Sequence, residues 1–269
     1  MRLYAISDLH LDRRVNREAV LRLPDHGDDW LILAGDVGDT VDDLRFAIEQ
    51  FGRRFARLLW VPGNHELWSE PSGLGGVAKY QRLVALCREH GVVTPEDPYP
   101  AFACRGRRYR LAPLFLLYDY SFRPPEVPLD GAVDWSADSG VLAADELYLE
   151  PTPYPTRADW CRARCSETKR RLVEARRADE RLLLINHWPL RFEMAWLPRI
   201  PRFSIWCGTR CSEDWHVRFG AAVVIYGHLH IRGSYFRDGV RFEEVSLGYP
   251  RQWHPQLGIE TYLREILPG

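Results

Sequence analysis

Short apolar runs separated by longer, more polar stretches dominate the pattern of this chain. Five of these runs are four or five residues long and rich in Leu, Ile, Val and Ala. Runs of this length and composition predict buried strands rather than helices. The five strands are expected at residues 3–6, 31–34, 58–61, 182–185 and 222–226.

Three further segments are β-like, and each carries a feature that limits the strand. Residues 109–118 are strongly apolar, but Pro113 has no N–H for a sheet and predicts an edge strand or a break. Residues 231–236 and 240–245 flank Asp238-Gly239, a turn sequence that typically joins two hairpin strands. These segments therefore predict one strand that lies at a sheet edge or is broken at Pro113, and one hairpin.

Helical patterns lie between the strands. Residues 75–90 and 156–177 place apolar side chains three or four positions apart, which predicts amphipathic helices, and a shorter helix is expected at 16–23. Thr40 and Asp43 have the spacing of a capping box, which begins a helix. The core face of that helix is predicted from five apolar positions: Leu44, Ile48, Phe51, Phe55 and Leu58. The alternation predicts an α/β fold in which helices cover sheet strands.

The length of 269 residues favours a single domain, residues 1–269, over two domains. Residues 119–155 hold six prolines, too many for a long regular element, while their aromatic content argues against disorder. We therefore expect residues 119–180 to form an ordered insertion over the site. Residues 192–215 are irregular and aromatic, and we expect them to wall a cleft. Their large rings are Phe192, Trp196, Phe203, Trp206 and Trp215.

Charge gives little information about partners. A net charge of −1 provides no overall attraction to nucleic acid or to an anionic membrane. Lys79 and Lys169 are the two lysines among 36 basic residues, so arginine dominates. Guanidinium groups suit phosphate, but the arginines are spread along the whole chain, which favours codon bias as the explanation. Within the aromatic segment, Arg199, Arg202 and Arg210 are candidates for phosphate contacts.

The sequence shows no sign of export or membrane insertion. Strand-like sequence begins at Arg2 and the first motif at Asp8, which leaves no room for a signal peptide. The longest apolar runs, residues 114–117 and 221–226, are too short to cross a bilayer. We expect a cytoplasmic protein with no membrane partner.

Two pairs of cysteines have C-x-x-x-C spacing and raise the alternative of a zinc site. The spacing is looser than that of ordinary zinc fingers, and a reducing cytosol disfavours disulfides. Free thiols are therefore the preferred interpretation. The six cysteines are Cys87, Cys104, Cys161, Cys165, Cys207 and Cys211.

Residues that bind metals follow all five of the short buried strands. A single His after a strand is usually an ordinary loop residue, and Gly-Asp alone is usually a turn. The joint presence of carboxylate, imidazole and amide oxygen at five strand ends instead indicates a two-metal site. The motif residues are Asp8, His10, Asp36, Asp39, Asn64, His65, His187, His228 and His230.

The ordered series Asp-x-His, Gly-Asp-x-x-Asp, Gly-Asn-His-Glu, His-x-Pro and Gly-His-x-His resembles the calcineurin-like binuclear metallophosphoesterase superfamily. The resemblance covers residues 3–230, with no motif in residues 100–180. It implies a four-layer α/β/β/α sandwich, with two mixed sheets flanked by helices. It also implies a hydrolase that cleaves a phosphoester, more specifically a phosphodiester, with a water activated by two metal ions.

Carried over residue by residue, the resemblance implies two overlapping ligand sets. One ion would be held by Asp8, His10, Asp36 and His230, and the other by Asp36, Asn64, His187 and His228. His65 would assist the leaving group as a catalytic acid, oriented by Asp39. The donor types lead us to expect two divalent cations, Mn²⁺ first, with Fe or Zn²⁺ as alternatives.

Residues 207–209, 213–216 and 238–251 resemble actinobacterial members of the superfamily, some of which remove the phosphopantetheinyl arm from acyl carrier proteins. A phosphopantetheinyl-acyl carrier protein is therefore the candidate substrate and partner. The alternatives are a nuclease or nucleotide phosphodiesterase, a general phosphatase, and a non-catalytic binding scaffold. Nucleic acid is disfavoured because no basic stripe interleaved with aromatics is present.

Overall fold

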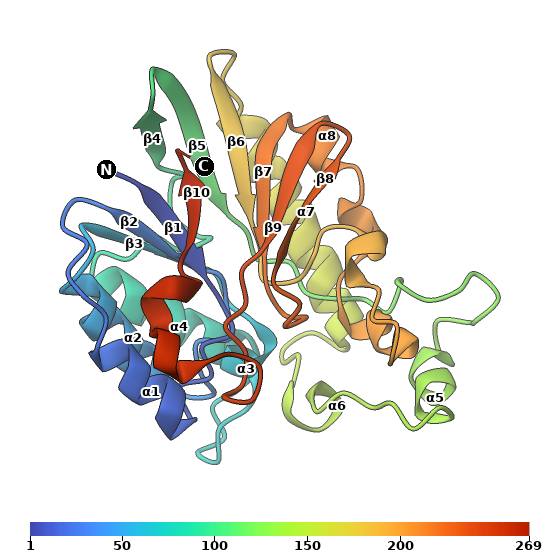
Figure 1. The fold of residues 1–269 in the computed structure, drawn as a ribbon. Coiled ribbons are helices and arrows are strands. Elements are labelled where there is room, and N and C mark those ends of the chain that lie inside the picture. Colours follow the sequence, from blue (N-terminus) through green and yellow to red (C-terminus); the bar gives the residue numbers. More distant parts are fainter. Residues whose placement is uncertain (269) are drawn as a thin grey trace.

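The computed structural model describes residues 1–268, and its strands form two separate sheets (Figure 1). The first sheet has four strands in the order β10-β1-β2-β3. Strands β1, β2 and β3 run parallel, and β10 pairs antiparallel with β1. The strands are β10 (Arg264–Leu267), β1 (Leu3–Ile6), β2 (Trp30–Leu33) and β3 (Arg57–Trp60).

The second sheet has six strands in the order β4-β5-β6-β7-β9-β8. Its inner strands from β5 to β9 are parallel, and each edge strand is antiparallel to its neighbour. The strands are β4 (Ala101–Cys104), β5 (Arg107–Pro113), β6 (Glu180–Ile185), β7 (Ala221–Tyr226), β9 (Val240–Glu244) and β8 (Gly233–Arg237).

The two sheets pack against each other through the inner faces of their strands. Side chains on a strand alternate between its two faces, so every second residue can face the other sheet. Ala5 of β1 and Ile32 of β2 share one buried cluster with Leu183 and Ile185 of β6. A single cluster that draws on both sheets shows that the sheets lie face to face.

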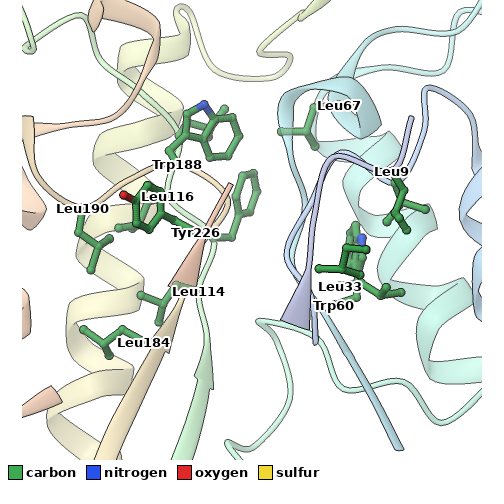
Figure 2. Close-up of a cluster of buried hydrophobic side chains, with 14 of the residues drawn as sticks. Leu9, Leu33, Trp60, Leu67, Leu114, Leu116, Leu184, Trp188, Leu190 and Tyr226 are labelled. Carbon is green, nitrogen blue, oxygen red and sulfur yellow. The ribbon is translucent and has the colours of Figure 1, made fainter. Parts of the chain in front are cut away.

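Helices cover the outer faces of both sheets. Leu33 and Trp60 point towards the helices of the N-terminal half, and Leu114 and Leu184 lie beside α7 on the other side (Figure 2). The resulting order is helix, sheet, sheet, helix, which confirms the predicted four-layer α/β/β/α fold. The α-helices are α1 (Arg14–Leu21), α2 (Val41–Gly52), α3 (Asn64–Leu67), α4 (Gly76–Glu89), α5 (Ala132–Ala137), α6 (Asp145–Tyr148), α7 (Arg157–Ala175) and α8 (Trp215–Arg218).

Short 3₁₀ helices complete the secondary structure: η1 (Phe192–Ala195), η2 (Pro201–Trp206), η3 (Arg210–Ser212), η4 (Pro255–Leu257) and η5 (Ile259–Tyr262). Among residues 1–268, no helix is both long and apolar enough to cross a membrane.

The helix that begins after Thr40 is shorter than predicted. The capping box at Thr40 and Asp43 is present, but α2 ends at Gly52. Leu58 instead pairs with Leu31 as part of β3. Leu58 lies at helical spacing from Phe55 by coincidence. An apolar residue can belong to the buried face of a helix or to a buried strand, and only strand pairing decides between the two.

The predicted strand over residues 109–118 is also too long, because β5 ends at Pro113. After this proline the chain leaves the sheet, and Leu116 N–H donates to the side chain of Asn186 (3.0 Å) rather than to a strand. The predicted break is therefore confirmed, while the predicted edge position is wrong, since β5 lies between β4 and β6.

Candidate metal centre

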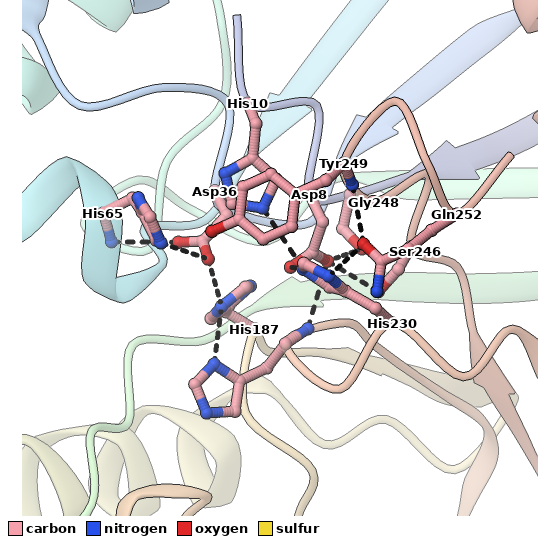
Figure 3. Close-up of polar contacts among 12 residues, drawn as sticks. Asp8, His10, Asp36, His65, His187, His230, Ser246, Gly248, Tyr249 and Gln252 are labelled. Atoms are coloured by element: carbon pink, nitrogen blue, oxygen red, sulfur yellow. Dashed lines mark hydrogen bonds and ion pairs between the residues drawn. The ribbon is translucent and has the colours of Figure 1, made fainter. Parts of the chain in front are cut away.

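The carboxyl ends of the parallel strands bring the predicted site residues together. Strands β1, β2 and β3 are parallel in one sheet, and β6 and β7 are parallel in the other. Side chains that follow these strands therefore meet between the sheets at one edge (Figure 3). The structure gathers all the predicted residues there: Asp8, His10, Asp36, Asp39, Asn64, His65, His187, His228 and His230.

Backbone strain is concentrated at this edge. Within residues 1–268, eight residues other than glycine have positive φ angles, and five of these eight are predicted metal ligands. Such conformations cost of order 1–3 kcal/mol each and occur often at functional sites, where the surrounding structure holds them in place. The strain therefore marks these strand ends as functional. The five angles are +53° at Asp8, +42° at His10, +51° at Asp36, +74° at His228 and +54° at His230.

The first group of candidate ligands consists of Asp8, His10 and His230. His230 Nε2 lies 2.9 Å from Asp8 Oδ1 and 3.2 Å from His10 Nε2. His230 Nδ1 donates to Gln252 Oε1 (2.8 Å); burial disfavours the charge of His230, but the carboxylate of Asp8 outweighs burial and raises its pKa, so a cation here must displace a proton. Lone pairs this close repel each other unless a proton or a cation lies among them. The donor set therefore fits a divalent cation.

The second group consists of Asp36, His187 and His228. His187 Nε2 lies 3.3 Å from both Asp36 Oδ2 and His228 Nδ1, and Asn64 Oδ1 lies 3.1 Å from that same His228 nitrogen. His187 Nδ1 donates to the carbonyl oxygen of Ala34 (3.0 Å), which directs Nε2 into the group. These contacts gather two imidazole nitrogens, a carboxylate and an amide oxygen, a mixed donor set that suits Mn²⁺, Fe or Zn²⁺.

The histidines of the centre differ in protonation state. Burial, followed by the charge of His65, lowers the pKa of His10 to about 3. Burial and the charge of His187 lower the pKa of His228 to about 3 as well, so both rings are neutral at pH 7, the form that binds metals. At His187, burial opposes protonation, but the charge of Asp36 outweighs it and raises the pKa to about 10. A cation at this position must therefore displace a proton.

Hydrogen bonds behind the first group hold Asp8 in one orientation. Its Oδ2 accepts from Ser7 Oγ (2.6 Å), Ser246 Oγ (2.7 Å) and the backbone N–H of His228 (3.0 Å). These three donors leave Oδ1 facing His230. Such outer contacts fix the geometry of metal ligands. No motif in the sequence marks Ser246 as a site residue, although it lies in the segment 238–251 that carries the resemblance.

Glu66 joins the loops that carry Asp36 and Asn64. It is fully buried, and its carboxylate accepts from the backbone N–H groups of Asp36 (2.8 Å), Val37 (2.9 Å) and Gly63 (2.9 Å). Burial and the charge of Asp36 raise its pKa to about 7. The motif containing Glu66 was recognised, but this bracing role was not, because the role depends on a loop 30 residues away in sequence.

His65 faces the centre and is held by Asp39. Its Nδ1 lies 2.8 Å from Asp39 Oδ1, and its Nε2 lies 4.0 Å from Asp36 Oδ2. Burial disfavours its charge, but the charge of Asp36 and the hydrogen bond that Nδ1 donates to Asp39 outweigh burial and raise the pKa of His65 to about 9. His65 also forms a group with His10 and Asp36 whose ligand atoms lie within 4.8 Å of one another. The geometry is therefore compatible with either an acid or a ligand.

Part of the predicted aromatic wall is wrong. Trp206 and Trp215 are buried at 0% and 1% exposure and belong to the core rather than to a cleft. They were misassigned because an irregular segment gives no periodicity from which to separate inward and outward rings. Phe203 does reach the centre, with its ring stacked 5.9 Å from that of His228. Trp196 remains 51% exposed.

Two of the three arginines named as phosphate contacts are occupied elsewhere. Arg202 lies over the ring of Trp135 and donates to its backbone oxygen. Arg210 lies over the ring of Phe192 and donates to the backbone oxygen of Ser121 (2.9 Å). Both guanidinium groups therefore have protein partners that brace the aromatic segment, which weakens the prediction of a role in phosphate binding.

Gly63 lies so close to Asp36 that no residue with a Cβ fits at this position. A Cβ at this position would lie 2.1 Å from Asp36 Oδ1 and 2.5 Å from the backbone nitrogen of Asp36. We expect Gly63→Ala to lower the free energy of unfolding by about 1–3 kcal/mol, measured by urea denaturation, because backbone must move. Gly52→Ala is the matched control, because a Cβ added at Gly52 would meet no atom within 4 Å outside its own helix. This substitution should be neutral or stabilise the protein by up to about 1 kcal/mol. Equal stability of the two variants would contradict the steric argument.

The fold and the donor groups together define a metal-dependent phosphoesterase. Residues 1–232 match the family described as calcineurin-like phosphoesterase, a range that includes every residue of the predicted site. The chain belongs to this family. Family membership implies a metal centre, and the buried Asp and His groups could hold the metals.

The chain is similar over its whole length to a characterised relative. It is 45% identical over 271 residues to the acyl-carrier-protein phosphodiesterase PptH of Mycobacterium tuberculosis, covering 99% of this chain and 83% of that protein. The crystal structure of phosphopantetheinyl hydrolase (PptH) from the same organism matches with a TM-score of 0.94 and 44% identity, over 100% of this chain and 96% of that one. These matches confirm the predicted family and fold.

Proposed function

We propose that this chain is a phosphodiesterase that removes the phosphopantetheinyl arm from acyl carrier proteins. The observation that carries the proposal is the 45% identity to PptH across 99% of the chain, because similarity of that extent includes the site and its surroundings. In the proposed reaction, water adds to phosphorus and the bond from phosphorus to the carrier-protein serine oxygen breaks. The products are the free serine hydroxyl and the phosphorylated pantetheine arm.

We propose that the two ligand groups each hold one divalent cation, with Asp36 shared between them. Asp8, His10 and His230 would complete one site, and Asn64, His187 and His228 would complete the other. The converging ligand atoms and the neutral imidazoles of His10 and His228 support this assignment, and the donor types favour Mn²⁺, with Fe or Zn²⁺ as alternatives. When bound, such cations neutralise charge on the phosphoryl oxygens and lower the pKa of water towards about 7.

We propose that His65 supplies the proton needed by the leaving serine oxygen. Asp39 accepts a hydrogen bond from Nδ1 (2.8 Å), which favours the protonated ring and leaves Nε2 facing the centre. An alkoxide is a poor leaving group, so a proton donor at this position would accelerate the cleavage of a serine ester more than that of an activated ester.

Aromatic side chains around the centre favour the proposal of an elongated substrate. Trp68 packs on His65 with ring centroids 3.8 Å apart, and Tyr148 of α6 lies 5.4 Å from Trp68. Phe203 stacks against His228 with ring centroids 5.9 Å apart, and Tyr249 stacks on His10 at 4.3 Å. An amide-containing arm with apolar methyl groups can pack against such rings.

The test is a substrate panel with the Mn²⁺-loaded protein. Holo-acyl carrier protein, single-stranded DNA, a cyclic nucleotide and a phosphomonoester are compared by kcat/KM, and carrier-protein cleavage is followed by the mass of the released arm. We expect holo-carrier protein to be preferred by about 10²-fold or more, since binding energy from its arm contributes to the transition state. Comparable hydrolysis of DNA or of the monoester would contradict the proposal.

A further inference from the structure

Asp145 lies directly behind Asn64, although 81 residues separate them in sequence. It begins the short helix α6 and is only 2% exposed. Asp145 Oδ1 accepts a hydrogen bond from Asn64 Nδ2 (2.9 Å) and another from Trp68 Nε1 (2.7 Å). Asp145 itself does not belong to any of the groups of converging ligand atoms found within residues 1–268. Its contact with the centre is therefore made through Asn64.

This contact determines which end of the Asn64 amide faces the metal centre. The indole Nε1 of Trp68 can only donate, so Asp145 Oδ1 is an acceptor, and the Asn64 amide presents its NH₂ to that oxygen. The amide oxygen then points the other way, 3.1 Å from His228 Nδ1. If the amide were reversed, its oxygen would face the carboxylate and its NH₂ would face the centre, where it cannot bind a cation.

The helix that carries Asp145 is braced on both sides. Arg157 of α7 donates to the backbone oxygen of Asp145 (2.8 Å) and to the carboxylate of Glu146 (2.8 Å). The N–H of Ser69, just beyond α3, donates to the backbone oxygen of Tyr148 (2.7 Å). The position of the carboxylate is thus set by two parts of the chain, one of which follows directly on the helix of Asn64.

We propose that Asp145 is a positioning residue of the metal centre, which holds the Asn64 amide so that its oxygen faces the cation. The inference rests on the role of Asn64 as a ligand in the proposed function. Burial of a carboxylate costs folding free energy, and hydrogen bonds offset only part of that cost. A positioning role for Asp145 gives a reason why a carboxylate is nevertheless buried here. Outer-shell partners of this kind typically contribute 10–100-fold to metal affinity.

Asp145→Ala and Asp145→Asn separate positioning from packing. We expect Asp145→Ala to weaken binding of one of the two Mn²⁺ ions by about 10–100-fold, measured by titration followed by electron paramagnetic resonance. Asp145 Oδ2 has no hydrogen-bond partner within residues 1–268, so an asparagine can place its NH₂ there and keep both bonds at Oδ1. Asp145→Asn should therefore bind Mn²⁺ within a few-fold of wild type. Wild-type affinity in Asp145→Ala would overturn the inference.

Trp68→Phe is the matched control for the other hydrogen bond to the same oxygen. It removes the indole donor but leaves the Asn64–Asp145 contact, so both Mn²⁺ affinities should stay within a few-fold of wild type. Weakening equal to that of Asp145→Ala would show that the carboxylate acts on local packing rather than on Asn64, and would contradict the proposal. The thermal stability of the metal-free proteins is measured in parallel to identify any variant that is only unfolded.

An exchange of the two side chains tests the contact even if Asp145→Ala does not fold. Asn64→Asp alone would place two carboxylates against each other and should weaken Mn²⁺ binding. Combining it with Asp145→Asn restores a carboxylate–amide pair with its roles exchanged, and we expect the double variant to bind Mn²⁺ at least about 10-fold more tightly than Asn64→Asp. If the double variant binds no better than the single one, the coupling does not exist.

Asn64→Ala distinguishes this inference from the proposed ligand role. If it binds both ions as wild type does, the ligand role and the inference both fail. If it loses one ion while Asp145→Ala keeps both, the inference alone fails. These measurements use Mn²⁺ and no phosphoester, so they are independent of whether the substrate is a carrier protein.

Discussion

Asp36→Ala is expected to abolish hydrolysis and to deplete both metal ions. Asp36 is the one residue in common between the group with His187 and His228 and the group with His10 and His65. Its Oδ1 also accepts from the backbone N–H of His65 (3.0 Å), so it orders the residue proposed as the acid. Loss of a shared carboxylate removes charge stabilisation from both sides of the phosphoryl group, and we expect kcat/KM to fall by about 10³-fold or more.

Metal content measured by inductively coupled plasma mass spectrometry accompanies the kinetics of Asp36→Ala. Asp42→Ala provides a matched control, because its carboxylate is 91% exposed in the first turn of α2 and has no contact with the centre. This control should keep wild-type metal content and activity, with at most about 1 kcal/mol lost from its place near a helix N-terminus. An Asp36→Ala protein that retained two metals and wild-type turnover would contradict the proposed site.

His65→Ala is expected to impair a serine ester far more than a nitrophenyl ester. A serine alkoxide needs a proton as it departs, whereas nitrophenolate leaves readily without one. General acid catalysis contributes about 10²–10⁴-fold, so kcat/KM for holo-carrier protein should fall by that factor and kcat/KM for a nitrophenyl phosphodiester should fall much less. Asp39→Asn should show the same pattern more weakly, since Asp39 acts on the substrate only through its 2.8 Å contact with His65 Nδ1.

Metal content decides between the two roles that the geometry allows for His65. If His65 is an acid, His65→Ala keeps both ions and its losses depend on the leaving group. If it is a ligand, as its group with His10 and Asp36 would permit, the variant loses metal and fails equally on both esters. His90→Ala, which removes an exposed histidine after α4, controls for the substitution itself. Equal losses with both ions retained would rule out the acid role.

The convergence of the candidate ligands was predictable from sequence because each follows a short strand whose apolar pattern is local. Asp8 comes two residues after β1, and His187 comes two residues after β6. Once these strands are taken as parallel, their carboxyl ends must share an edge, and the residues that follow them must converge. The assignment of Asn64 and His65 followed from the family motif. It remains a prediction until metal binding is measured.

The residues that support the ligands were not predictable in the same way. Glu66 was visible in the motif, but its bonds to the loop of Asp36 depend on how two loops pack. Asp145 lies in a segment without a motif, and its contact with Asn64 spans 81 residues. A carboxylate in a proline-rich loop carries no signal of burial, so neither its 2% exposure nor its partner could be read from the sequence.

Local apolar patterning and motif order by themselves determined the α/β class, the five short buried strands and the identity of the candidate ligands. Patterning is sufficient for these features because a strand and the residues after it are contiguous in the chain. The two sheets were implied only through the family resemblance, and tertiary structure alone decided the end of α2 before Leu58 and the addition of β10 beside β1. It also decided which aromatic rings are core and which carboxylates brace the centre. Each of these outcomes depends on pairing or burial between segments far apart in sequence, and such contacts leave no local periodicity.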